Sequence, residues 1–170
     1  MERIALIGLP GSGKSTVGKL LADQIGVPFL DVDEALELKS GWSPTRWIVE
    51  KGLPAFRAAE ALLVADATAR LEEPLVMATG GGVVEMAEVC QHLQLWRCIW
   101  LDAPDSILLE RCREGSRPLL DGEDPGRLLG QLRRRREASF RQLSGDPLET
   151  EGISPSLVVD AILSRLEEAT

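Results

Sequence analysis

The chain has 170 residues, of which 44% are apolar and 27% charged, and its formal net charge is −8 with a pI near 4.8. This length and composition are typical of one globular domain, here residues 1–170, and no apolar run approaches the roughly 20 residues of a membrane span. The acidic balance disfavours binding to nucleic acid or to an anionic membrane, so we expect a small-molecule ligand.

The stretch GLPGSGKST, residues 8–16, fits the phosphate-loop pattern GxxxxGK[ST]. An apolar run over residues 4–7 predicts a buried strand before it, and apolar residues at helical spacing over residues 17–25 predict a helix after it. In this context the pattern binds nucleotide phosphates, whereas a chance glycine-rich turn is the alternative. The residues expected to contact the nucleotide are Gly11, Ser12, Gly13, Lys14, Ser15 and Thr16.

Strands and helices alternate along the rest of the chain, which favours an α/β fold with a parallel sheet and helices on both faces. Further strands are expected over residues 28–31, 75–79, 96–101 and, more weakly, 147–150. Helices are expected over residues 34–40, 55–71, 104–112, 127–140 and 156–168. Glycine and proline recur between the third and fourth of these helices, which indicates a mobile lid at about residues 113–126.

Ligands of open α/β sheets bind at the carboxyl ends of strands, so acids that follow strands are candidate site residues. Asp31 and Asp33 stand at the end of the second strand and lie on the same side if the extended conformation persists. One carboxylate can face Mg²⁺ and the other an acceptor hydroxyl. The alternatives are that both are solvated, or that Asp33 caps the helix over residues 34–40. Asp102 follows the fourth strand, but Pro104 favours a role at the start of a helix.

Glycines 80–82 follow the third strand and expose bare backbone to a ligand, with a tight turn as the alternative. Arg57 and Glu60 are one helical turn apart and can pair, which either orients the guanidinium for a ligand or forms only a surface ion pair.

The run Arg133 to Arg136 spreads round a helix, so at most two of its members can face a ligand and a solvated face explains the others. Arg117 lies in the lid, where closure can bring a positive charge to a transferring phosphoryl group.

Histidine and cysteine offer little chemistry. The only histidine, His92, is expected on a short polar helix away from the strand ends, so any general base is a carboxylate. The three cysteines show no CxxC spacing, which favours reduced thiols. The N-terminus runs directly into the phosphate loop, so cleavage as a signal peptide would destroy the motif, and we expect a cytoplasmic protein.

Together these motifs resemble those of the shikimate kinase family over nearly the whole chain. Five of them occur in the family's order: the phosphate loop, Asp31-Val32-Asp33, Phe56-Arg57-Ala58-Ala59-Glu60, Ala78-Thr79-Gly80-Gly81-Gly82 and Arg117-Pro118-Leu119-Leu120. The resemblance implies a three-layer αβα phosphate-loop kinase fold with a five-stranded parallel sheet, of the nucleoside-monophosphate-kinase type. It also implies ATP-dependent phosphorylation of the 3-hydroxyl of shikimate.

The resemblance further implies roles for single residues. ATP and Mg²⁺ are the implied cofactors, with Ser15 and Asp31 serving the metal, Arg117 the phosphates, and Arg111 with Pro155 the adenine. Shikimate would be held by Asp33, Arg57, Gly80, Gly81, Gly82 and Arg136, with the two arginines on its carboxylate. The implied catalytic residues are Lys14, Asp33 and Arg117.

The chain departs from the family pattern at three places. Leu53 follows Gly52 where the family commonly has glutamate, and Phe140 stands where it often has tyrosine. The spacing from Arg111 to Arg117 is one residue shorter than usual.

Two other functions compete with this interpretation. Another small-molecule kinase of the same fold, such as a gluconate kinase, would also bind a carboxylate. A nucleotide-dependent switch or inactive binding module is disfavoured, because the chain has no NKxD guanine-recognition motif. For a kinase of this kind we expect a monomer without nucleic-acid or membrane partners.

Overall fold

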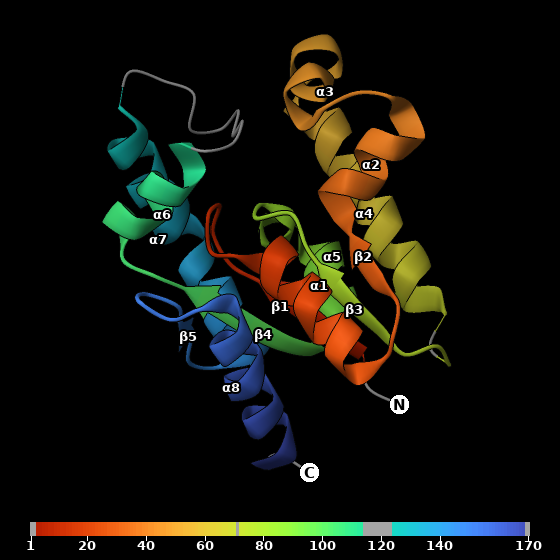
Figure 1. The fold of residues 1–170 in the computed structure, drawn as a ribbon. Helices are drawn as coiled ribbons and strands as arrows, with labels where there is room; N and C mark the ends of the chain where they lie inside the picture. The colour runs from red at the N-terminus through yellow and green to blue at the C-terminus, as the bar shows by residue number, and fades with distance from the viewer. Residues whose placement is uncertain (1–2, 71, 114–123, 169–170) are drawn as a thin grey trace.

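The computed structural model describes residues 3–70, 72–113 and 124–168, in which five strands and eight α-helices alternate (Figure 1). The strands are β1 (Arg3–Ile7), β2 (Phe29–Asp31), β3 (Leu75–Ala78), β4 (Arg97–Asp102) and β5 (Leu148–Glu149). The helices are α1 (Lys14–Ile25), α2 (Val32–Ser40), α3 (Pro44–Lys51), α4 (Leu53–Ala69), α5 (Ala87–Leu93), α6 (Asp105–Arg113), α7 (Pro125–Ser144) and α8 (Pro155–Glu168), with a 3₁₀ helix η1 (Val83–Glu85).

The five strands form one sheet in the order β2-β3-β1-β4-β5, and every neighbouring pair is parallel. In the centre of the sheet, β1 pairs with β3 on one side and with β4 on the other. Parallel strands require crossover connections, which the intervening helices supply. The predicted five-stranded parallel sheet is therefore confirmed.

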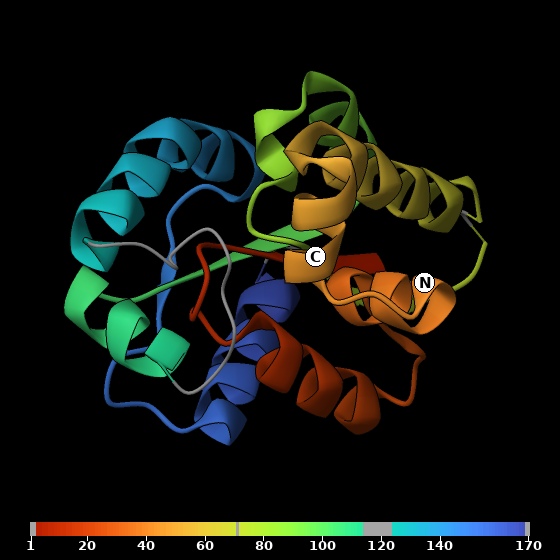
Figure 2. The same ribbon diagram turned by 90° about the horizontal axis from the view of Figure 1, so that it is seen from above.

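Alternate residues of β1 face two separate hydrophobic layers. Ile4 and Leu6 pack with apolar residues of α1 and α8, whereas Ala5 and Ile7 pack with those of α4, α5 and α7. Figure 2 shows these two groups of helices on opposite sides of the sheet. All four side chains are fully buried, so β1 lies in the middle layer of a three-layer αβα structure, as predicted.

The expected helices are present with shifted ends. The longest, α7, begins at Pro125 because Asp124 caps it by accepting a hydrogen bond from the backbone N–H of Arg127, and proline is well suited to a first helical turn. Most of the predicted lid, about residues 113–126, lies outside the described residues. None of the described helices combines the length and the apolar character that a membrane crossing requires.

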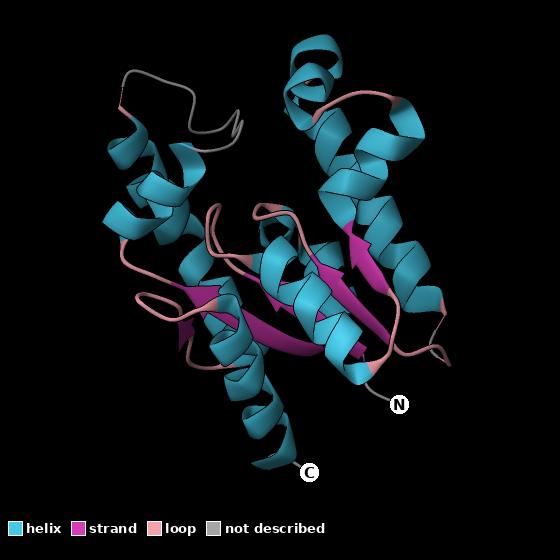
Figure 3. Ribbon diagram, viewed as in Figure 1, coloured by secondary structure: helices cyan, strands magenta, loops and turns pink. Residues whose placement is uncertain are grey.

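The loops that follow β1 and β3 lie side by side at one edge of the sheet (Figure 3). A Cβ placed on Gly81 would lie 3.4 Å from the carbonyl oxygen of Gly8, so the two loops are in contact. The sheet order reverses at β1, and ligands of open α/β sheets bind at such a point. The candidate site residues therefore meet where the fold class expects a ligand.

Candidate active site

The phosphate loop joins β1 to α1 and is tightly folded. Gly11 has a φ of 81°, a conformation that favours glycine. A Cβ on Gly8 would overlap the carbonyl oxygen of Leu101 on the neighbouring strand β4. Lys14 bends back over the loop, where its Nζ donates to the carbonyl oxygens of Gly8 and Leu9 at 3.0 Å. The loop thus lies at the N-terminus of α1, where free N–H groups and the helix dipole favour phosphate.

Ser15 and Asp31, the predicted magnesium ligands, are in direct contact, because Ser15 Oγ donates a hydrogen bond to Asp31 Oδ2. The other carboxylate oxygen accepts from the backbone N–H groups of Asp33 and Glu34 at 3.0 and 3.1 Å. Asp31 is therefore the N-cap of α2, and the alternative that Asp33 caps this helix is wrong. A hydroxyl and a carboxylate beside the phosphate loop are ligands that Mg²⁺ accepts together with phosphate oxygens, so the pair fits a nucleotide-bound metal.

Asp33 lies in the first turn of α2, because the helix begins at Val32 and the extended conformation ends there. Its Oδ1 lies 3.2 Å from the position that a Cβ would take on Gly80, at the end of the neighbouring strand β3. Asp31 contacts Ser15 instead. The two carboxylates thus face different parts of the sheet edge, and their assignment to metal and acceptor stays a prediction.

The predicted pair of Arg57 with Glu60 on α4 is confirmed, and it is not a surface ion pair. The Glu60 side chain is fully buried and that of Arg57 is 12% exposed. A Cβ on Gly80 would overlap Glu60 Oε1, and one on Gly82 would overlap Arg57 Nη2. The glycines are therefore needed for the close approach of this pair, a packing reason that the residue spacing did not reveal.

Glu60 is an unusually weak acid for a glutamate. Burial raises its pKa to about 7, although the positive charge of Arg57 acts in the opposite direction. The nearby charge of Asp33 adds to the increase. Such a perturbed carboxyl next to strand ends is typical of a functional site.

Arg136 reaches the triple glycine from α7. Its side chain is 1% exposed, and a Cβ on Gly81 would lie 3.3 Å from its Nη1. Nη2 donates to Glu85 at 3.2 Å, while Nε and Nη1 are buried and have no hydrogen-bond partner among the described residues. Burial lowers the pKa of Arg136, Glu85 opposes this change and the charge of Arg57 adds to it. Two guanidinium groups therefore converge on one place, an arrangement that fits a bound carboxylate.

The rest of the arginine run does not form one solvated face, so that part of the prediction is wrong. Arg134 is exposed, and Arg135, 60% exposed, pairs with Glu85. Arg133 is only 23% exposed and pairs with Asp102 and Asp105. Three of the four arginines have ion-pair partners on other elements, and Arg135 and Arg136 share the partner Glu85.

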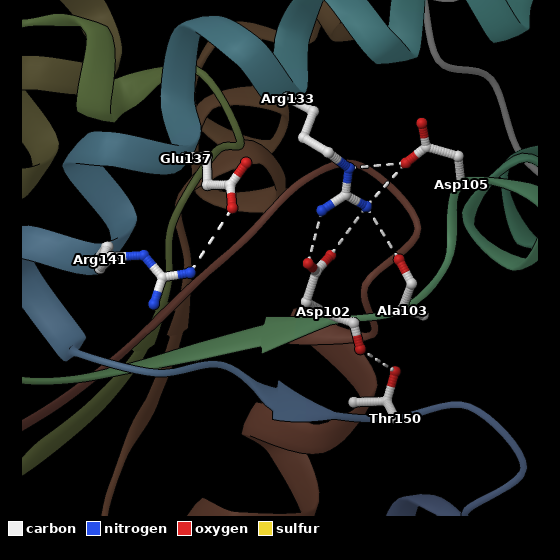
Figure 4. A network of polar contacts seen from close by, with 7 residues as sticks. All are labelled: Asp102, Ala103, Asp105, Arg133, Glu137, Arg141 and Thr150. Carbon is white, nitrogen blue, oxygen red and sulfur yellow. Dashed lines mark hydrogen bonds and ion pairs between the residues drawn. The ribbon is translucent and has the colours of Figure 1, made fainter.

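Arg133 links α7 to the end of β4 and the start of α6 by hydrogen bonds and ion pairs (Figure 4). It donates to both carboxylate oxygens of Asp102, at 2.6 and 3.2 Å, to Asp105 Oδ1 at 2.7 Å and to the carbonyl oxygen of Ala103 at 2.9 Å. The predicted helix-start role of Asp102 is wrong, since Asp102 is the last residue of β4 and α6 begins at Asp105.

Arg111 lies beside the phosphate loop. Its Nη1 donates to the carbonyl oxygen of Gly11 at 3.3 Å and to Thr150 Oγ1 at 2.9 Å, and its Nη2 donates to the carbonyl oxygen of Thr150 at 3.0 Å. Thr150 in turn donates its backbone N–H and its hydroxyl to the carbonyl oxygen of Asp102. Pro155 is the exposed first residue of α8. The adenine role of Arg111 and Pro155 stays a prediction.

The remaining predicted residues differ in placement. Ser12 is buried inside the phosphate loop, and Thr16 is exposed on the first turn of α1. Arg117 lies outside the described residues. His92 lies on α5, as predicted. Glu85 was missed, although an acid three residues after a triple glycine is a signal that could have drawn attention to it.

Phosphate-loop kinases are the class of enzyme that this sheet order, this loop and the neighbouring carboxylates and arginines define. The family model described as shikimate kinase matches residues 10–167. The chain belongs to the shikimate kinase family.

Individual relatives agree with this assignment. The chain is 38% identical over 171 residues to the shikimate kinase of Pseudomonas savastanoi pv. phaseolicola, a match that covers 99% of this chain and 98% of the relative. It is 34% identical to the shikimate kinase of Rhodococcus jostii, with 98% of both chains covered. These matches span nearly the whole of each protein.

Solved structures give the same result. The structure of the shikimate kinase from Acinetobacter baumannii in complex with shikimate superposes with a TM-score of 0.94 at 31% identity, covering 100% of this chain and 95% of that one. A gluconokinase from Sinorhizobium meliloti superposes with a TM-score of 0.62 at 20% identity, covering 99% and 94%. The second similarity shows a shared fold alone.

Proposed function

We propose that this protein transfers the γ-phosphate of ATP to the 3-hydroxyl of shikimate and releases ADP and shikimate 3-phosphate. The observation that carries the proposal is the convergence of Arg57 and Arg136, both largely buried, on the triple glycine next to Asp33. A buried guanidinium binds a carboxylate strongly, so the site suits a small acceptor with one carboxylate and a hydroxyl. Shikimate has both groups, and family membership supports it as the acceptor.

The phosphate loop binds ATP. Backbone N–H groups of the loop bind the phosphates, and Lys14 turns from the loop carbonyl oxygens that it now contacts to the β- and γ-phosphate oxygens. Its charge then neutralises the charge that the phosphate oxygens carry in the transition state. Mg²⁺, held by Ser15 and Asp31, supplies further charge neutralisation at the phosphates when it is bound.

Asp33 and the two arginines serve the acceptor. Arg57 and Arg136 bind the carboxylate, which places the 3-hydroxyl beside Asp33, and Gly80 to Gly82 lie against the ring. The hydroxyl oxygen forms a bond to the γ-phosphorus, the bond from that phosphorus to the β,γ-bridging oxygen breaks, and its electrons leave with ADP. The hydroxyl proton passes to the Asp33 carboxylate.

Several finer assignments complete the proposal. Arg117 brings a positive charge to the transferring phosphoryl group from a lid at about residues 113–126. Arg111 and Pro155 bind the adenine, and the contact of Arg111 with Gly11 supports a place near the nucleotide. The protein acts as a single-domain monomer in the cytoplasm. Light scattering after size-exclusion chromatography tests the monomer, and cell fractionation tests the location.

An assay of ADP release tests the acceptor. Purified protein with ATP and Mg²⁺ is given shikimate, gluconate or a nucleoside monophosphate in separate reactions. We expect turnover with shikimate, its loss in Lys14→Met, and its retention in Lys19→Met, which removes the same charge from an exposed position of α1. Turnover with gluconate but not with shikimate would overturn the proposal. ADP release that no acceptor increases would instead indicate a nucleotide-dependent module.

A further inference from the structure

Glu85 is an acid at the edge of the proposed acceptor site, and it pairs with two neighbouring arginines of α7. It ends the short helix η1, three residues after the last glycine of the triple glycine. Its Oε2 accepts from Arg136 Nη2 at 3.2 Å, and its Oε1 forms an ion pair with Arg135 Nε at 2.8 Å. The Glu85 side chain is 28% exposed, so its carboxylate is partly shielded from water.

Arg136 depends on Glu85 for charge balance when no ligand is bound. Glu85 is its sole ion-pair partner among residues 3–70, 72–113 and 124–168, and the Arg136 side chain is 1% exposed. The neighbouring Arg57 has an ion-pair partner of its own, Glu60. A buried charge without a partner is strongly destabilising, so the Glu85 carboxylate stabilises the ligand-free site.

The same contact opposes ligand binding. When a carboxylate ligand reaches Arg136, the guanidinium Nη2 already donates a hydrogen bond to Glu85, and the charge of Glu85 partly neutralises the guanidinium. It also finds a second negative charge next to its own. Coulomb repulsion between two carboxylates at one guanidinium weakens the binding of the mobile one.

We propose that Glu85 is a positioning residue that competes with the acceptor carboxylate for Arg136 and thereby sets the affinity of the site for substrate and product. This inference rests on the proposed function only in naming shikimate as the ligand. The phosphorylated product keeps the same carboxylate, so competition by Glu85 weakens its binding as well and favours its release.

Arg135 moderates this competition. Its Nε lies 2.8 Å from Glu85 Oε1 on the exposed side of α7. The positive charge of Arg135 therefore offsets part of the negative charge that Glu85 presents to Arg136. Removing Arg135 therefore leaves Glu85 free to neutralise Arg136 more fully. The two variants should change the affinity for shikimate in opposite directions, and the effect of Arg135 should require Glu85.

The first experiment measures shikimate binding by titration calorimetry. Glu85→Gln keeps the shape of the side chain and removes its charge, so the dissociation constant should fall about two- to fivefold, the range expected for a partly exposed ion pair. The constant for shikimate 3-phosphate should fall by a similar factor. Glu88→Gln, which removes an exposed acid three residues away, should leave both constants unchanged.

A neutral acceptor provides the sharpest control. The methyl ester of shikimate has no carboxylate, so Glu85→Gln should not tighten its binding. If Glu85 only supports the local packing, its replacement would weaken the binding of the acid and the ester alike. Weaker or unchanged binding of shikimate by Glu85→Gln would overturn the inference.

The second experiment uses Arg135. Arg135→Gln should raise the dissociation constant of shikimate about twofold, whereas it should change nothing when Glu85→Gln is also present. Arg134→Gln removes the same charge from the exposed neighbour and serves as the control. An equal effect of Arg135→Gln in both backgrounds would contradict the role of Glu85. Failure of the unaltered protein to bind shikimate would refute the proposed function itself, a result distinguishable from both.

Discussion

Replacement of the buried carboxyl Glu60 by glutamine should make protein stability less sensitive to pH. Glu60 is fully buried beside Arg57, and burial raises its pKa to about 7 from an ordinary value of 4.5. Between these two values the folded protein binds a proton that the unfolded chain does not bind. The free energy of unfolding of the unaltered protein therefore falls as pH rises through this window.

The structure sets the size of this effect. Each pKa unit corresponds to about 1.4 kcal/mol, so the shift from 4.5 to about 7 corresponds to about 3 kcal/mol at full titration. Between pH 5 and pH 8 most of that change takes place. Because the amide that Glu60→Gln introduces cannot titrate, the stability of this variant relative to the unaltered protein should increase by about 2–3 kcal/mol over this interval.

Urea unfolding at pH 5, 6, 7 and 8 measures the difference. Asp66→Asn on the same helix is the matched control, because the Asp66 side chain is 63% exposed, and its difference from the unaltered protein should stay nearly constant. A constant difference for Glu60→Gln across the same interval would refute the argument that burial dominates the pair with Arg57. A difference that decreases with pH would mean that the ion pair, not burial, decides the pKa of Glu60.

Three further substitutions test the site and its frame. Arg136→Ala should raise the shikimate KM about 30-fold or more, since it removes a buried charge partner of the substrate carboxylate. Arg134→Ala should leave the KM within about twofold. An equal rise in KM for both variants would indicate that the run acts as a basic patch. Asp33→Asn should lower kcat about 10²- to 10⁴-fold with MgATP affinity unchanged, and full activity would exclude Asp33 as the proton acceptor. Arg133→Met should lower the free energy of unfolding by about 2–3 kcal/mol because it leaves Asp102, 8% exposed, without its partner; a loss below about 0.5 kcal/mol would show that the network is not stabilising.

Local sequence patterns predicted most of the strands and helices and the position of the phosphate loop. Apolar runs and helical spacing are properties of neighbouring residues, so they located the strands and helices of the sheet without knowledge of their packing. The phosphate loop is equally local, because a strand, a helix and the glycines between them suffice to form it. The pair of Arg57 with Glu60 was predictable for the same reason, since one helical turn separates the two residues.

Tertiary packing alone decided how the proposed acceptor site is charged. Glu85 and Arg136 are 51 residues apart, and they meet because α7 packs against η1. Arg133 reaches Asp102 only because α7 also crosses the end of β4. Burial of Glu60 depends on close approach to Gly80, which no spacing encodes. Contacts between distant segments and the loss of water around charged groups arise only when the elements are assembled, and these two effects set the pKa values of Glu60 and Arg136.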